Sequence, residues 1–101
     1  MGIKTLKEIK ETIVRCKPEL KRTFNIKEIG IFGSYINGEQ DEKSDLDILV
    51  VFEDDARLTL LDMVGLEIEL SELLGVKVDL VEKKCLKPFI GQHILKEVVY
   101  I

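Results

Sequence analysis

Apolar residues recur at helical spacing near the N-terminus of the chain. Thr5 and Glu8 have the spacing of a capping box, which marks the start of a helix. The apolar positions that follow are three or four residues apart: Leu6, Ile9, Ile13, Cys16 and Leu20. This stripe predicts an amphipathic helix that packs in the core, faces a partner, or is divided between the two. We expect Pro18 to break the helix and to open a second short helix over residues 19–23, since proline suits a first turn.

Three short apolar runs farther along the chain predict β-strands. Ile29–Phe32 and Leu46–Phe52 are almost continuously apolar, which is typical of buried strands. Residues 76–81 alternate between two faces, with Val76, Val78 and Leu80 on one and Lys77, Asp79 and Val81 on the other.

A second amphipathic helix is predicted between the last two of these strands. Thr59 and Asp62 repeat the capping pattern at its start, and Gly75 stands where a helix end favours a left-handed residue. Its apolar stripe comprises Leu60, Met63, Leu66, Leu70 and Leu73. We expect this stripe to face the core.

The C-terminal part of the chain predicts one more helix and an apolar end. Pro88 opens a helix to about Lys96, in which His93, the lone histidine, is a surface or packing residue. Because an exposed apolar tail is a liability, we expect residues 98–101 to add a strand or to meet a partner protein. The order strand–helix–strand–helix–strand predicts an α/β fold with a small mixed sheet and flanking helices.

Length and charge narrow the class of protein. The 101 residues suit one domain, residues 1–101. The chain has 15 Lys and Arg against 19 Asp and Glu, a formal net charge of −4. This balance argues against direct, non-specific nucleic-acid binding, which draws mainly on a positive surface.

The positions of the lysines and cysteines also bear on the cellular compartment of the protein. No apolar run approaches the length of a membrane span, and Lys4, Lys7 and Lys10 interrupt any signal-peptide core. Cys16 and Cys85 are isolated thiols without C-x-x-C spacing, so a zinc site is not expected and a reducing compartment fits. We expect a cytoplasmic protein.

The candidate chemistry lies between the first two strands. Gly33 and Ser34 form a tight strand-to-helix turn, with Ser34 placed to cap the helix, and free N–H groups at a helix start seat phosphate oxygens. Asp45 and Asp47 are two residues apart at the second strand, so their carboxylates point the same way. Two such charges resist joint ionisation, and Mg²⁺ held with substrate phosphates relieves that cost.

Each of these features can also be explained without a functional site. A bare Asp-x-Asp is common by chance at strand entrances, and acids in the polar loop Glu39–Lys43 are expected to be solvated rather than to bind metal. An acid in the middle of a strand, as Asp79 is, needs an edge position or a metal ion as its reason. The turn, the carboxylate pair and Asp79 together favour a site.

A known family has the same set of residues. The chain resembles the nucleotidyltransferase superfamily related to DNA polymerase β in Gly33-Ser34, Gly38 and Ser44-Asp45-Leu46-Asp47 before an apolar strand. It is more similar still to the minimal nucleotidyltransferases (MNT domains), small proteins often paired with a HEPN-domain toxin, over almost the whole chain from about Ile29. Asn37 stands where the family commonly has Arg, a difference that affects one phosphate or substrate contact and not the metal site.

The resemblance implies a Mg²⁺-dependent enzyme that transfers a nucleoside monophosphate, AMP from ATP, to a hydroxyl. It implies that Asp45, Asp47 and Asp79 hold the metal, with Asp79 also the base for the attacking hydroxyl. Gly33 and Ser34 would bind the nucleotide phosphates. By resemblance alone, the acceptor is a tyrosine of a cognate HEPN toxin, which makes the chain an antitoxin.

Two other functions stay open at this stage. In the first, the chain is a non-catalytic antitoxin that masks a partner protein, an alternative that Asn37 favours and the three aspartates oppose. In the second, the chain modifies a small molecule such as an antibiotic. That chemistry needs extra substrate-binding mass, which a chain of 101 residues has only if it forms an oligomer.

Overall fold

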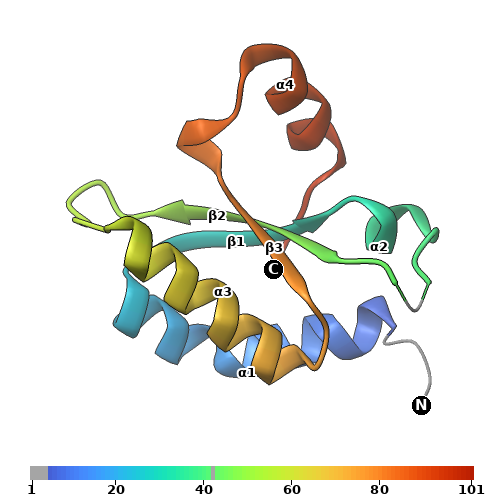
Figure 1. Ribbon diagram of the computed structural model, residues 1–101, viewed down its shortest axis with the longest axis horizontal. Helices are drawn as coiled ribbons and strands as arrows, with labels where there is room; N and C mark the ends of the chain where they lie inside the picture. The colour runs from blue at the N-terminus through green and yellow to red at the C-terminus, as the bar shows by residue number, and fades with distance from the viewer. Residues whose placement is uncertain (1–4, 42) are drawn as a thin grey trace.

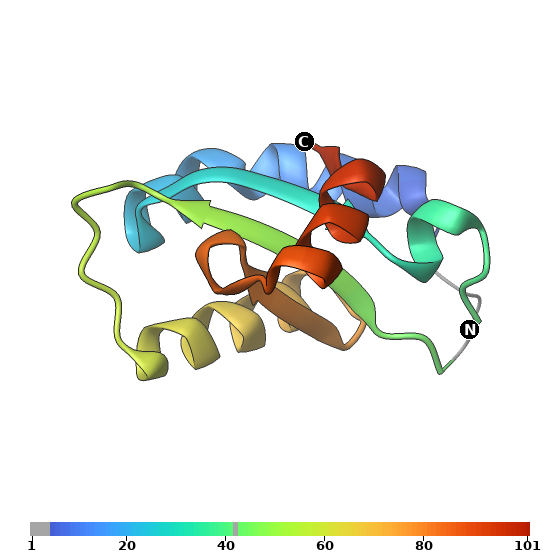
Figure 2. The ribbon, with the colours of Figure 1, turned by 90° about the horizontal axis from the view of Figure 1, so that it is seen from above.

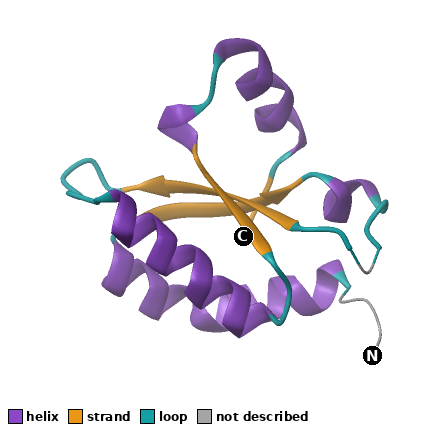
Figure 3. Ribbon diagram, viewed as in Figure 1, coloured by secondary structure: helices purple, strands orange, loops and turns teal. Residues whose placement is uncertain are grey.

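The computed structural model describes residues 5–41 and 43–101, which form a four-stranded sheet with helices on both faces (Figure 1). The elements are α1 (Leu6–Phe24), β1 (Ile26–Phe32), α2 (Ser34–Asn37), β2 (Leu46–Phe52), α3 (Leu60–Leu74), β3 (Val78–Glu82), a 3₁₀ turn (Lys83–Cys85), α4 (Pro88–Glu97) and β4 (Val99–Tyr100). The predicted α/β class with a small mixed sheet is confirmed (Figure 3). Lys4 and the loop residue Glu42, which entered the sequence interpretation, lie outside the described residues.

The sheet has the strand order β3-β2-β1-β4. β1 is antiparallel to both β2 and β4, whereas β2 and β3 are parallel. In this register Asp47 lies between Phe32 of β1 and Asp79 of β3. Helices α1 and α3 lie side by side on one face of the sheet, and α4 lies on the other (Figures 1 and 2).

The main hydrophobic core lies between the sheet and the α1–α3 layer. The side chains of β2 are divided between the two faces of the sheet. On the face toward α1 and α3, the core cluster includes Ile48, Val50 and Phe52. Side chains alternate along a strand, so Asp47 and the fully buried Leu49 point to the opposite face, where α4 lies. The face that carries Asp47 is therefore covered by α4 and not by the main core.

Helix α1 begins as predicted but does not break at Pro18. The Thr5 side chain accepts a hydrogen bond from the Glu8 N–H at 3.2 Å, which confirms the cap. The predicted break and second helix are wrong, because α1 runs through Pro18 to Phe24. Proline costs a helical hydrogen bond, but burial of Leu20 two residues later holds the last part of the helix against the core.

Helix α3 also begins and ends as predicted. Thr59 and Asp62 form a reciprocal capping box, and Gly75 ends the helix with φ of 69°. The predicted apolar stripe is wrong at its two ends: Leu60 is 79% exposed and Leu73 is 43% exposed, while the helix buries Leu66, Leu70 and Leu74. Leu60 borders an open pocket between the start of α3 and the end of β3 instead of packing in the core, which leaves it exposed.

The C-terminal elements follow the sequence interpretation closely. Pro88 is at the start of α4, and the apolar tail adds β4 to the sheet beside β1. The Ile101 N–H continues this pairing by donating to the Ile29 carbonyl at 2.9 Å. Within residues 5–41 and 43–101, no helix has both the length and the apolar character that a membrane crossing requires.

Candidate functional site

The turn after β1 is built around Gly33. Its φ of 82° and ψ of −151° lie in a region that is nearly restricted to glycine, and it forms the N-cap of α2. The predicted cap by Ser34 is therefore wrong, because Ser34 is the first helical residue and no side chain caps α2. The Gly33 carbonyl accepts the N–H groups of Ile36 and Asn37, which closes the turn. The strand-to-helix turn itself is confirmed.

A carboxylate of the neighbouring strand packs directly against this turn. A Cβ atom added to Gly33 would overlap Oδ2 of Asp47, which belongs to β2. Phe32 and Asp47 are paired across β1 and β2, so the register itself brings the Asp47 side chain beside the following Gly33. A glycine is therefore required both by its backbone angles and by the space that Asp47 occupies.

The three predicted aspartates lie at the same end of β2 and β3. Asp47 and Asp79 are direct partners in the parallel pair, and Asp45 immediately precedes β2. Asp45 is not part of the strand, and its Oδ2 atom lies 4.0 Å from the Lys77 Nζ atom in an exposed ion pair. Asp79 is exposed on a strand at the edge of the sheet, so its edge position alone accounts for an acid there.

The electrostatics of this cluster are concentrated on Asp47. The pKa of the Asp47 carboxyl is raised from 3.8 to about 6, chiefly by burial and then by the nearby charges of Asp79, Asp45 and Glu97, in that order of effect. Several carboxylates therefore share a region with little positive charge to balance them. Such a region favours either a proton or a cation on Asp47.

This raised pKa predicts how the stability of the metal-free protein changes with pH. The folded protein binds a proton at Asp47 more tightly than the unfolded chain does, so this group destabilises the fold as pH rises from about 4 through about 6. The pKa difference corresponds to about 3 kcal/mol, and solvent screening reduces the expected effect to about 1–2 kcal/mol. In urea unfolding with EDTA, Asp47→Asn should thus gain stability over wild type at about pH 8 and lose that gain at about pH 4. A stability gain of Asp47→Asn that does not vary with pH would contradict the raised pKa of Asp47.

Carboxylate oxygens are the ligands that Mg²⁺ prefers, and the residues present suit that ion. Mg²⁺ is usually held by one or two carboxylates with waters and substrate phosphates rather than by a closed protein cage. Across the described ranges, no three His, Cys, Asp or Glu side chains enclose a point as a complete metal cage would. The adjacent Asp47 and Asp79, with their unbalanced charge, fit an open site in which the substrate supplies the remaining ligands.

The structure adds a fourth acid that the sequence interpretation did not single out. Glu97, in the last turn of α4, accepts the Gly33 N–H through Oε1 at 2.5 Å and lies 3.4 Å from the Asn37 side-chain nitrogen. Its other oxygen is 3.6 Å from Nε2 of the exposed His93. The only local signal is that Glu97 is an acid at the C-terminus of a helix, where the helix dipole disfavours negative charge, and this signal does not indicate a contact with Gly33.

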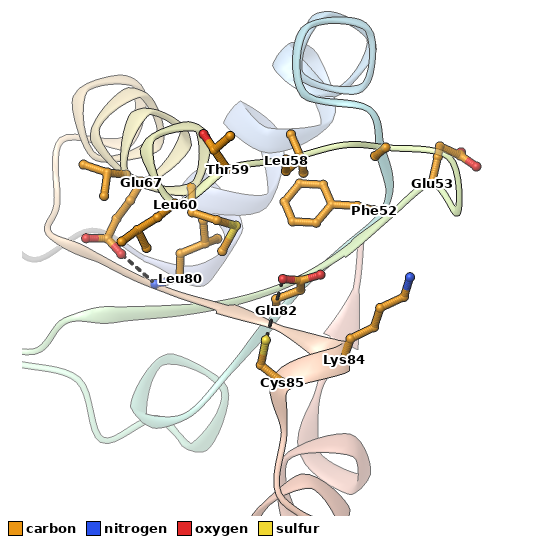
Figure 4. A pocket seen from close by; sticks show the side chains of 13 residues that line it. Phe52, Glu53, Leu58, Thr59, Leu60, Glu67, Leu80, Glu82, Lys84 and Cys85 are labelled. Carbon is orange, nitrogen blue, oxygen red and sulfur yellow. Dashed lines mark hydrogen bonds between the residues drawn. The ribbon is translucent and has the colours of Figure 1, made fainter.

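A pocket of about 490 Å³ lies at the other end of the same two strands (Figure 4). It opens between the start of α3 and the end of β3, and Phe52, Leu60, Leu80 and Glu82 are among its lining residues. None of the three aspartates lines it. Because Asp47 and Asp79 are at the beginning of β2 and β3, this pocket is separate from the carboxylate cluster.

A mixed sheet with a glycine turn against paired carboxylates suits the class of enzymes that carry out metal-assisted phosphoryl transfer. Residues 13–101 match the family described as the nucleotidyltransferase domain. The protein adenylyltransferase MntA of Thermococcus cleftensis is 48% identical to this chain over 101 residues, which cover the whole of both chains. The chain therefore belongs to the nucleotidyltransferase family and is a nucleotidyltransferase.

Solved structures agree with this assignment. A structure assigned as a minimal nucleotidyltransferase superposes with a TM-score of 0.71 at 35% identity, over 90% of this chain and 93% of that one. A toxin–antitoxin crystal structure with AMP-PNP superposes with a TM-score of 0.72 at 28% identity, over 94% of this chain and 72% of that one. The predicted resemblance to the minimal nucleotidyltransferases is confirmed.

Proposed function

We propose that this chain transfers AMP from ATP to a hydroxyl of a partner protein, with Mg²⁺ held by Asp45, Asp47 and Asp79. The observation that carries the proposal is the register that pairs Asp47 with Asp79 and packs Asp47 against the Gly33 turn. A phosphate-binding turn and metal-binding carboxylates must be in contact for one nucleotide to engage both. The name of the MntA relative, a protein adenylyltransferase, supports AMP as the transferred group.

Each residue has a definite part in the proposed reaction. Asp45 and Asp47 hold the metal against the triphosphate, and the Gly33–Ser34 turn seats the phosphates behind the reacting α-phosphorus. Asp79 takes the proton of the acceptor hydroxyl as its oxygen bonds to the α-phosphorus. The bond between that phosphorus and the bridging oxygen breaks, and pyrophosphate leaves with the electron pair. When bound, Mg²⁺ stabilises the charge that develops on the phosphate oxygens.

We propose that the acceptor is a tyrosine of a HEPN-domain toxin and that the chain acts as its antitoxin. A toxin–antitoxin complex is among the similar solved structures, and its bound AMP-PNP is an ATP analogue. The carboxylate end of β2 and β3 is open enough for a protein side chain, since Asp79 is exposed there. The acceptor hydroxyl is thus expected to approach from the side of Asp79.

Calorimetric titration of ATP, with and without Mg²⁺, tests the nucleotide site. Wild type is expected to bind ATP in a metal-dependent way, and Asp45→Asn is expected to lose that dependence because one ligand oxygen loses its charge. Incubation with α-labelled ATP and a candidate toxin then tests for label on a toxin tyrosine. Label that appears equally with Asp45→Asn would exclude the proposed chemistry.

The second candidate function is neutralisation of a partner by binding alone. It is favoured by the exposed apolar side chains on α3, where Leu60 is 79% exposed and Leu61 is 82% exposed. This function predicts full inhibition of the toxin without ATP and Mg²⁺, retained by Asp45→Asn. Inhibition that requires both ATP and the aspartate would instead support catalysis.

A further inference from the structure

The Gly33 N–H, proposed above as part of the phosphate seat, already has an anionic partner within the chain. Oε1 of Glu97 accepts this N–H at 2.5 Å, and its charge makes this a charge-assisted hydrogen bond. The same oxygen is 3.4 Å from Nδ2 of Asn37 in α2. One carboxylate therefore contacts both ends of the segment from Gly33 to Asn37, where nucleotide phosphates are expected.

Glu97 is largely buried and lies close to other carboxylates. Its side chain is only 16% exposed, and its charge contributes to raising the pKa of Asp47. The cation that could offset it, a protonated His93, lies 3.6 Å away and is itself 82% exposed. An additional carboxylate beside three others is costly unless the N–H and amide groups that hold it make up the difference.

Glu97 lies at the C-terminal end of α4, far from the start of that helix at Pro88. Its hydrogen bond to the Gly33 N–H joins this end of α4 to the turn after β1. Figures 1 and 2 show α4 standing on the opposite face of the sheet from α1 and α3, joined to the 3₁₀ turn on one side and to β4 on the other. Displacement of the Glu97 side chain and the last turn of α4 therefore leaves the main core between α1, α3 and the sheet in place.

We propose that Glu97 is an internal competitor of the nucleotide: its carboxylate occupies the phosphate position at Gly33, and phosphate must displace this side chain to bind. This inference rests on the proposed function, because it assumes that the phosphates bind at Gly33. A polyphosphate that arrives with a metal ion has the advantage over Glu97, since it brings both more acceptor oxygens and the cation that the aspartates lack. In the free protein, Glu97 closes the site to weaker anions.

Two substitutions of Glu97 distinguish the effect of its negative charge from the effect of the space that its side chain fills. Glu97→Gln keeps the shape and an acceptor oxygen but removes the charge, whereas Glu97→Ala empties the position. The probe is α,β-methylene ATP with Mg²⁺, because the methylene group that bridges its α and β phosphorus atoms is not cleaved during titration. Glu72→Gln, on the exposed surface of α3, is the matched control for the loss of one negative charge.

Both Glu97 variants are expected to lower the Kd of the analogue by about tenfold, equivalent to about 1.4 kcal/mol, while Glu72→Gln leaves it unchanged. Binding by the variants where wild type shows none would support the inference even more directly. Equal or weaker binding by both variants, with normal metal-dependent binding by wild type, would overturn the inference and leave the proposed function intact. Absence of binding by all four proteins would overturn both.

Hydrogen exchange of the wild-type protein gives a test that needs no variant. Addition of the analogue and Mg²⁺ is expected to speed exchange of the amides in the last turn of α4, because Glu97 no longer joins it to Gly33, while the amides of β2 and β3 become better protected. A helix that only stabilises the Gly33 turn would instead stay as protected as before. Stronger protection of α4 in the nucleotide complex would contradict displacement.

Discussion

Asp47→Asn is expected to lower the rate of nucleotidyl transfer by about a thousandfold or more, because a metal-assisted step depends on several kcal/mol of charge stabilisation. Asp47 has the central position in the cluster: it is paired with Asp79 across the strands, and its side chain touches the Gly33 turn. Asn keeps the size of the side chain but binds a hard cation weakly.

The same substitution is expected to leave the fold intact. Removal of a carboxylate whose pKa is raised to about 6 relieves repulsion from Asp79, Asp45 and Glu97 at neutral pH. Asp54→Asn, in the exposed connector before α3, is the matched control and should keep full transfer activity. The measurement is single-turnover release of pyrophosphate with saturating ATP and acceptor, beside thermal unfolding of both variants. A folded Asp47→Asn protein with undiminished turnover would exclude Asp47 from the reaction.

Gly33→Ala is expected to be the most damaging single methyl addition to this chain. The new Cβ atom would overlap Oδ2 of Asp47, and the backbone at φ 82° is strained for any residue with a side chain. The expected loss is about 2–3 kcal/mol of unfolding free energy. Metal-dependent ATP binding should be lost as well, since Asp47 has to leave its position to make room.

Gly38→Ala tests the cost of backbone strain without an overlap with another side chain. Gly38 has a similar φ of 72°, but no atom lies within 4 Å of a Cβ added there. Its cost is therefore expected to be about 1 kcal/mol, from strain alone, without a shift of Asp47. Urea unfolding and ATP titration of both variants make the comparison. Equal destabilisation of the two, with ATP still bound by Gly33→Ala, would show that the contact with Asp47 is unimportant.

Local patterns predicted the elements of this fold well. The capping residues Thr5 and Thr59 and the C-cap Gly75 mark helix ends through hydrogen bonds and backbone angles that depend on a few neighbouring residues. The two errors have a tertiary cause. α1 tolerates Pro18 because Leu20 is buried beyond it, and α3 exposes Leu60 because this residue borders an open pocket instead of the core.

The candidate site was predictable only in part. The spacing of Asp45 and Asp47 and the preceding glycine turn are local, and the resemblance of this motif to a known family implied Asp79. The cap proposed for Ser34 failed by one residue, because the backbone angles of Gly33 make Gly33 the N-cap. Glu97 had no signal that indicated its contact with Gly33, since its role depends on where α4 packs.

By itself, then, the sequence determined which segments are helices and strands, where the chain turns at Gly33, and which aspartates are candidates for metal. Only the tertiary structure decided that β3 runs parallel to β2 with Asp79 beside Asp47, and that Glu97 binds a residue 64 positions before it. The physical reason is the distance along the sequence over which each kind of interaction acts. Periodicity and caps act within a few residues, whereas strand register and helix placement are set by how the whole core packs.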